Sequence, residues 1–221
     1  MAMRVEDMTV VQLATTHPLA TRVLYRHGIE FCAGAPRSLT EACREAAVEV
    51  GAVLAEIERE EAGGAAGTAW SERPLGELVD HILVAFHDVE RLEMDAVRDL
   101  LAATAATLPR LAARDELAEA FGRLRTELTE HMAKEEAVLF PWLRSGRGDL
   151  ARTPIQVMMM EHESTLCLLN EVRGRLRAFA ATAPLQAADV AARLAEFDHH
   201  VREHMHLENN VLFTRALRGE A

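Results

Sequence analysis

The apolar positions of this chain recur at the spacing of amphipathic helices, in short segments at first and then in long ones. A proline at position 18 separates two short segments, and a turn-rich loop with two glycines and a proline follows them. Ser38 and Glu41 then form a capping box that opens a longer helix. The first part of the chain therefore predicts a small helical unit, with helices at residues 9–14, 19–27 and 38–60 and a loop at residues 28–37.

From Pro74 onward the helical segments become longer. Four of them are predicted, each of roughly 30 residues and about 45 Å, at residues 75–107, 114–144, 154–181 and 185–218. Four long helices joined by short loops form an up-down-up-down bundle. Glycines cluster between the two parts, as is typical of a flexible linker. The prediction is an all-α chain with a small amino-terminal domain at residues 1–62, a linker at 63–73 and a four-helix bundle at 74–221.

The composition agrees with helices and restricts the partners. Ala, Leu, Glu and Arg dominate, and these residues favour helix over strand. The formal charge of −11, from 24 basic and 35 acidic residues, argues against nucleic acid or an anionic membrane as a partner. The start lacks the apolar core of a signal peptide, and no stretch has the roughly 18 apolar residues of a membrane span. Three cysteines, an odd number, argue against a disulfide framework, so we expect a cytoplasmic protein.

One ten-residue stretch occurs twice. Residues 131–140 and residues 204–213 both read H-M-x-x-E-x-x-V-L-F. Residues four apart lie on one face of a helix, one turn above the other, so each copy places an imidazole beside a carboxylate. A single histidine with a carboxylate at this spacing is common in so acidic a chain. Two copies of this spacing with matching flanking residues are not expected by chance. The repeat therefore predicts that the histidine and the glutamate of each copy have a function together.

Each copy of the motif has a further histidine on the helix before it. His87 precedes His131 by 44 positions, and His162 precedes His204 by 42. The bundle is therefore predicted to be two helical hairpins that face each other about an approximate twofold axis. A lone histidine on a helix is usually a surface or core residue, but the duplicated spacing favours a ligand set. Its predicted members are His87, His131, Glu135, His162, His204 and Glu208.

Four imidazoles and two carboxylates are too many for one tetrahedral zinc ion. Two divalent ions would carry four positive charges, and two bridging carboxylates would neutralise half of them. Mixed nitrogen and oxygen ligation with open positions suits iron or manganese better than calcium or magnesium. Ferritin-like bundles hold related two-metal sites with more carboxylate, so the larger share of imidazole favours iron here.

Three neighbouring residues have more than one interpretation. Glu127 lies one turn before the first copy of the motif, and Glu161 directly precedes a predicted ligand. Both are either solvated helix charges or groups that guide cations inward and orient the ligand imidazoles. His200 shares a helix stripe with the second copy of the motif, so by spacing alone it could replace His204 as a ligand.

These segments also resemble a known family. From about residue 74 the chain resembles hemerythrin-like bundles, and over nearly its whole length it resembles the RIC (repair of iron centres) proteins of the YtfE/ScdA type. The amino-terminal loop looks like the short cysteine-bearing domain (ScdA-N-like) of that family. The segments that carry the resemblance are Gly28–Cys32, Ser38–Cys43, Asp80–Ile82, Phe86–Asp88, His131–Pro141, Pro154–His162 and His204–Phe213.

The resemblance implies a non-haem di-iron centre held by the six residues of the internal repeat, and it prefers His204 to His200. It implies two iron ions, oxo- or hydroxo-bridged, with Glu135 and Glu208 as bridging carboxylates. The implied function is the repair of iron–sulfur clusters damaged by nitrosative or oxidative stress, by donating iron. Damaged iron–sulfur proteins or cluster-assembly proteins would be its partners. The alternatives are reduction of nitric oxide or peroxide at the di-iron centre, and a sensor that binds oxygen or nitric oxide.

One departure from the family concerns the amino-terminal loop. Its members commonly carry two adjacent cysteines there, whereas this chain has Cys32 followed by Ala33. A vicinal pair can donate two electrons or clamp a soft metal, and a single cysteine cannot do either alone. Cys32 is therefore a redox candidate that needs a partner, for which Cys43 is one choice. The amino-terminal unit has two predicted roles, docking on the bundle or mediating a homodimer.

Overall fold

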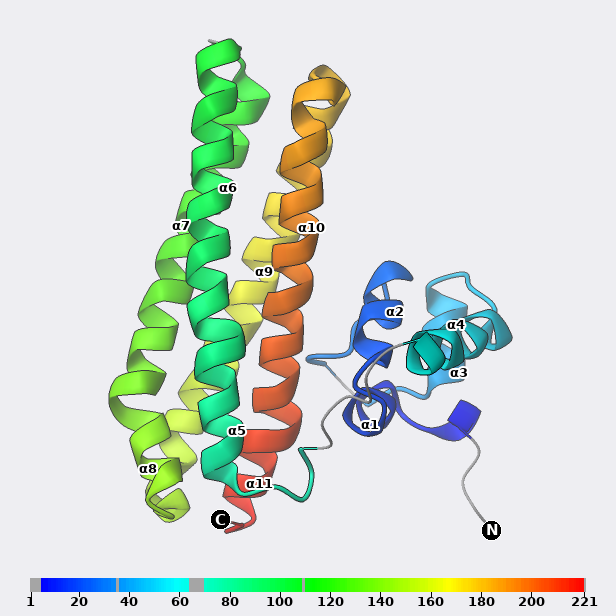
Figure 1. The fold of residues 1–221 in the computed structure, drawn as a ribbon, viewed down its shortest axis with the longest axis vertical. Helices are drawn as coiled ribbons and strands as arrows, with labels where there is room; N and C mark the ends of the chain where they lie inside the picture. The colour runs from blue at the N-terminus through cyan, green and yellow to red at the C-terminus, as the bar shows by residue number, and fades with distance from the viewer. Residues whose placement is uncertain (1–4, 35, 64–69, 109, 221) are drawn as a thin grey trace.

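The computed structural model describes residues 5–34, 36–63, 70–108 and 110–220, and the regular elements in these ranges are all helices. The elements from α5 (Leu75–Ile82) to α11 (Phe213–Leu217) form four long rods. Figure 1 shows the rods side by side in alternating directions, with a group of short helices against the flank of one of them. The predicted all-α class and up-down-up-down bundle are confirmed. No helix in the described ranges combines the length and apolar character that a membrane crossing requires.

Three of the four rods change their hydrogen-bonding pattern partway along, and α9 (Arg152–Thr182) alone among them is α-helical throughout. The change is a π-helical turn, in which an amide bonds the carbonyl five residues back instead of four. The amide of Asp88, for example, bonds the carbonyl of Leu83. The interrupted rods are α5 (Leu75–Ile82), η2 (Leu83–His87) and α6 (Asp88–Thr107); α7 (Ala112–Lys134), η3 (Glu135–Leu139) and α8 (Phe140–Arg144); and α10 (Pro184–His206), η5 (Leu207–Leu212) and α11 (Phe213–Leu217). A 3-10 turn, η4 (Gly148–Leu150), joins α8 to α9.

The sequence predicted the four rods but not the π turns within three of them. A π turn holds more residues than an α turn, so it shifts the helix face on one side of it relative to the other, and such turns are frequent at functional sites. Both copies of H-M-x-x-E-x-x-V-L-F contain one, η3 beginning at Glu135 and η5 beginning one residue before Glu208. The repeat in the sequence is thus also a repeat of local backbone geometry.

The amino-terminal unit differs from the prediction in its last helix. Residues 38–60 form two helices, because the chain leaves α3 through Ala47 at a φ of 56°. The amide of Val48 bonds the carbonyl of Cys43 at 2.9 Å, which closes this turn. The turn lets Cys43 and Val53, from the two helices, both be fully buried. The elements of the unit are η1 (Val5–Asp7), α1 (Val10–Thr16), α2 (Ala20–Arg26), α3 (Leu39–Glu45) and α4 (Val50–Gly63).

Two apolar clusters fill the described part of the chain. The larger one joins the amino-terminal unit to the bundle, with Phe31 of the loop in the same cluster as Met205 of α10. The smaller one fills one end of the bundle around Phe140 and Phe213. Along each rod, buried polar residues lie where the larger cluster ends and the smaller one begins. Residues 64–69 of the predicted linker lie outside the described residues, so the domain limits remain a prediction.

Candidate metal centre

Six buried side chains from all four rods meet between the two apolar clusters. They are the two His-plus-Glu pairs of the repeated motif and the two lone histidines, and none of these residues is more than 2% exposed. The set consists of His87, His131, Glu135, His162, His204 and Glu208. The structure thus brings together all six residues that the repeat selected. Three of the four rods bring theirs in through or directly beside a π turn.

The six side chains form two groups that share both carboxylates. In each group the potential ligand atoms lie within 4.8 Å of one another. One group has His87 and His204, from the first and last rods, and the other has His131 and His162, from the two middle rods. Each histidine pair therefore joins the two hairpins, and no pair comes from within one hairpin. The sequence alone did not decide this pairing.

Each carboxylate presents one oxygen to each group. This is the arrangement of a carboxylate that bridges two cations. The distances from oxygen to Nε2 are 3.4 Å for Glu135 Oε1 to His131, 3.4 Å for Glu135 Oε2 to His87, 3.1 Å for Glu208 Oε1 to His204 and 3.1 Å for Glu208 Oε2 to His162.

The outer nitrogen of every imidazole has an oxygen partner. With Nδ1 as the donor, Nε2 is a lone-pair acceptor that points inward, as in a metal-binding tautomer. Three of the partners are carboxylates and one is an amide. The Nδ1-to-oxygen distances are 2.8 Å from His87 to Glu136, 3.0 Å from His131 to Glu161, 2.8 Å from His162 to Asn209 and 3.0 Å from His204 to Glu90.

The inner atoms fit a pair of cations. Two Nε2 acceptors face each other at 3.2 Å between His87 and His204, and at 2.9 Å between His131 and His162. All four carboxylate oxygens of the two shared glutamates are buried without a hydrogen-bond partner. Buried acceptors without donors are costly, and a cation in each group would satisfy them. A donor set of imidazole nitrogen and carboxylate oxygen is one that iron accepts.

The electrostatics of the centre favour positive charge. Burial alone would lower the pKa of His131, but the carboxylates of Glu135 and Glu208 outweigh it and raise the pKa to about 9. Burial opposes ionisation of His204 in the same way, yet Glu208 and its neighbours raise the pKa of that imidazole well above its usual value. The imidazoles in turn overcome burial and hold the pKa of Glu208 well below its usual range. Without metal, protons would thus occupy the place of the cations.

The residues next to the centre differ in what they contact. Glu161 accepts from His131 and pairs with Lys134 at 2.6 Å. Glu127 accepts a hydrogen bond from Ser164 and from none of the six residues of the centre. With Glu161 it lines a surface cavity of about 190 Å³ that extends to His131. His200 lies outside both groups and pairs with Glu93 at 2.8 Å.

Three partners of the imidazoles were missed from the sequence. Glu136 and Asn209 occupy the same position of the repeated motif, directly after the shared glutamate, so the repeat itself held the signal. Glu90 lies three residues after His87, a spacing that many acidic residues of this chain have by chance. It is fully buried, which the sequence did not indicate.

Cys32, the redox candidate, is fully buried in the amino-terminal loop. Its thiol lies 2.9 Å from Oε1 of Glu30, to which it donates. Burial first, and then the charge of Glu30, raise the pKa of the Cys32 thiol well above its usual value. Cys43 is also buried and free, and burial raises its pKa as well. A raised pKa lowers the thiolate fraction, so neither thiol is prepared for redox chemistry in this conformation.

Comparisons with known proteins agree over nearly the whole chain. Residues 78–216 match the family model of the hemerythrin HHE cation binding domain, and residues 6–61 match ScdA_N, a domain of unknown function. The iron-sulfur cluster repair protein YtfE of Dickeya chrysanthemi (strain Ech1591) is 30% identical, over 99% of this chain and 100% of its own length. The protein of the same name from Yersinia pestis (strain Pestoides F) is 32% identical, over 94% of this chain and 96% of its own.

Proposed function

This chain belongs to the family of the YtfE iron-sulfur cluster repair proteins, with a hemerythrin HHE cation-binding domain, and we propose that it is a di-iron protein that repairs damaged iron–sulfur clusters by donating iron. The damage would come from nitrosative or oxidative stress, and damaged iron–sulfur proteins would be the partners. One observation supports the proposal above others: two buried groups of nitrogen and oxygen ligands share both of their carboxylates. In this proposal residues 74–221 hold the metal, and residues 1–62 form a separate domain docked on them.

The residues of the centre would have distinct tasks. Glu135 and Glu208 would bridge the two ions, and each pair of imidazoles would hold one of them through Nε2. Two nitrogens and two oxygens leave coordination positions free on each ion. Bound iron would supply a ferrous ion that can be oxidised or handed on. The hydrogen bonds at Nδ1 fix the ring orientations and raise the basicity of the ligands.

An acidic cavity on the surface offers a route for the cargo. The cavity beside His131 is lined by three glutamates, Glu127, Glu130 and Glu161, and by one lysine, Lys134, so negative side chains are in excess. Negative side chains around an opening concentrate cations at it. Since Glu161 also bonds His131, this residue would connect the opening to one of the two ions. We therefore propose Glu127 and Glu161 as the residues along which iron leaves the centre.

The transfer of labelled iron tests this function. The chain is loaded with ⁵⁷Fe and mixed with a purified protein whose iron–sulfur cluster has been damaged by nitric oxide. We expect label to appear in the restored cluster, and we expect the Glu208→Ala variant to load little iron and restore nothing. His200→Gln is a matched control outside the centre and should behave as the unchanged chain does. Iron that stays bound while the target remains inactive would contradict the proposal.

A second candidate is reduction of nitric oxide at the centre, which one cavity favours. A space of about 200 Å³ lies between the amino-terminal unit and the bundle, lined largely by apolar residues that include Phe86. The ring of Phe86 stacks on His204 with centroids 5.6 Å apart, so a small apolar gas would come close to a ligand there. Turnover with a reductant should yield a gaseous product. Stoichiometric nitrosylation without product would exclude this activity.

A further inference from the structure

The four imidazoles of the centre are not held alike. The outer partners of His87, His131 and His204 are carboxylates, whereas His162 has the neutral amide of Asn209. A hydrogen bond to a charged acceptor is stronger than one to a neutral acceptor and makes the imidazole a more basic ligand. The hydrogen bond from His162 to Asn209 is therefore the weakest of the four, and it depends most on the position of its acceptor.

Asn209 is positioned by the amino-terminal unit. Its Oδ1 accepts from His162 at 2.8 Å, and its Nδ2 donates to the carbonyl of Cys32 at 3.2 Å. Both contacts require the same orientation of the amide, so the carbonyl fixes which end of Asn209 faces the imidazole. Asn210 also donates to the carbonyl of Cys32, at 3.3 Å, but the other partner of its Nδ2 is Nδ1 of His206, at 3.1 Å, which belongs to neither ligand group.

The loop that provides this carbonyl is held against the bundle. Oε1 of Glu30 accepts from the amides of Phe31 and Cys32, each at 3.0 Å. The other oxygen of Glu30 pairs with Arg202 on α10, whose Nε donates to Asp198 at 2.8 Å. The Cys32 carbonyl is therefore held in place by an ion pair between the amino-terminal unit and the bundle, together with the contact of 3.2 Å between Nδ1 of His206 and the carbonyl of Phe31.

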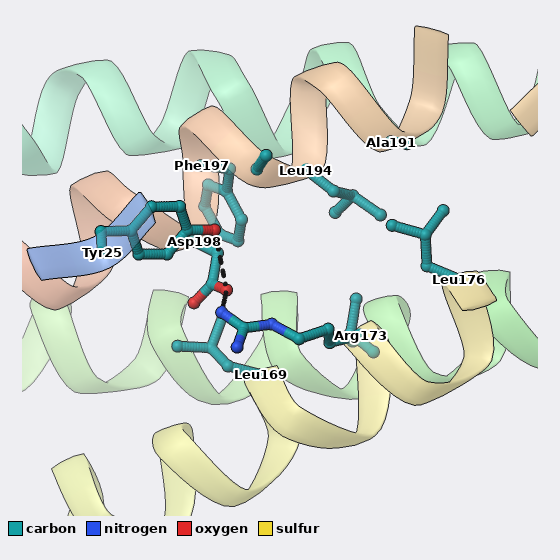
Figure 2. A pocket seen from close by; sticks show the side chains of 10 residues that line it. Tyr25, Leu169, Arg173, Leu176, Ala191, Leu194, Phe197 and Asp198 are labelled. Atoms are coloured by element: carbon teal, nitrogen blue, oxygen red, sulfur yellow. Dashed lines mark hydrogen bonds and ion pairs between the residues drawn. The ribbon is translucent and has the colours of Figure 1, made fainter. Parts of the chain in front are cut away.

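Asp198 extends this attachment to two more helices. The hydroxyl of Tyr25, on α2, donates to it at 3.1 Å, and Arg173, on α9, pairs with the same carboxylate (Figure 2). A mostly apolar cavity of about 90 Å³ lies beside this junction. Asp198, which is 7% exposed, thus ties the amino-terminal unit to two rods of the bundle.

The two copies of the motif differ where the amino-terminal unit docks. In the first copy the position after the shared glutamate is Glu136, which supports His87 and pairs with Arg91 at 2.6 Å near the surface. In the second copy the same position is Asn209, which supports His162 and is covered by the loop. A carboxylate there would repel the Cys32 carbonyl, whereas an amide can donate to it. The approximate twofold symmetry of the centre is broken at this contact.

We propose that Asn209 is a positioning residue through which the docked amino-terminal loop sets how tightly the ion between His131 and His162 is held. The inference rests on the proposed function, because it requires that the six ligands bind two ions. With the loop in place, the amide holds His162 with Nε2 directed into the centre. When the loop lifts, Asn209 loses its donor contact and His162 loses its fixed partner. The ion of that pair then leaves more readily than the ion between His87 and His204.

Release of iron to a colourless ferrous chelator tests the inference on the full chain. We measure iron per chain and the time course of chelation for the unchanged chain and for variants. Asn209→Ala should load iron and release one ion of the two about ten times faster or more, as loss of a metal ligand's partner commonly does. Glu30→Ala, which loosens the loop without contacting a ligand, should accelerate the same ion. The double variant should be no faster than Asn209→Ala, because coupled changes are not additive.

Two further variants separate positioning from general damage. Asn210→Ala removes a donor to the same carbonyl but leaves the partner of His162 in place, so it should accelerate release far less than Asn209→Ala does. Asn209→Asp keeps an acceptor for His162 and lacks the donor to Cys32, so it should retain the ion better than Asn209→Ala and become insensitive to Glu30→Ala. The insensitivity of Asn209→Asp to Glu30→Ala tests the proposal even if Asn209→Ala does not fold.

The outcomes of this experiment are distinguishable. A folded chain that binds no iron would overturn the proposed function. Two results would overturn the inference alone, in a chain that binds two ions. One is a release rate that Asn209→Ala does not change, and the other is a set of release rates on which Asn209→Ala and Glu30→Ala act additively.

Discussion

The metal-free protein should lose stability as the pH rises from 7 to 9. Without cations, His131 is the group whose pKa the buried carboxylates raise to about 9, against about 6.5 in an unfolded chain. A folded-state pKa above the unfolded value stabilises the fold fully below the unfolded value, and this stabilisation is lost as the pH rises through the folded value. A shift of this size corresponds to about 3 kcal/mol when complete, of which about 2 kcal/mol should disappear between pH 7 and 9.

Urea unfolding of the metal-free chain at the two pH values measures this difference. Burial lowers the pKa of His199 and of His206 to about 4, so the protonation of these two histidines changes the free energy of unfolding mainly below pH 7. The raised pKa of His204 adds a loss of the same sign. The His131→Gln variant should show a smaller difference, and the iron-loaded chain should not show this loss, because its imidazoles are then unprotonated ligands. Equal stability of the metal-free chain at pH 7 and 9, or greater stability at pH 9, would refute the electrostatic reasoning.

Three other predictions concern ligand sharing, the buried thiol and the turn at Ala47. His87→Ala should weaken the binding of one ion and Glu135→Gln that of both, because only the carboxylates belong to both groups. Metal analysis after dialysis against a chelator measures the ions that remain per chain, and the same loss in both variants would contradict this prediction. Cys32 should react with iodoacetamide far more slowly in the folded chain than in urea, because its thiol is buried and has a raised pKa. Mass spectrometry of the labelled peptides measures the two rates, and equally fast labelling of the folded chain would contradict this prediction. Ala47→Gly should raise the free energy of unfolding by up to about 1 kcal/mol, since glycine adopts a positive φ without strain; a fall in stability would show that the turn is held differently.

The residues of the candidate site could be predicted from the sequence because its histidines and glutamates recur at short, fixed intervals along the chain. Residues four apart on a helix share a face whatever the helix packs against, so His131 with Glu135, and His204 with Glu208, were defined before any tertiary contact was known. The repeat of that spacing, with a histidine at a similar distance before each copy, selected all six residues. The same periodicity predicted the all-α class and the four rods. It did not predict the π turns, because one extra residue in a turn leaves no clear mark in the pattern of apolar positions.

Tertiary structure decided how these residues combine. The pairing of His87 with His204 and of His131 with His162 depends on how the two hairpins face each other, which no local spacing records. Spacing left His204 and His200 as alternatives; in the structure His204 lies in one of the two groups, whereas His200 pairs with Glu93 outside both. The contact of Asn209 with the Cys32 carbonyl joins residues 177 positions apart. Sequence determined which side chains each helix presents, and the packing of helices far apart in the chain determined which of them meet.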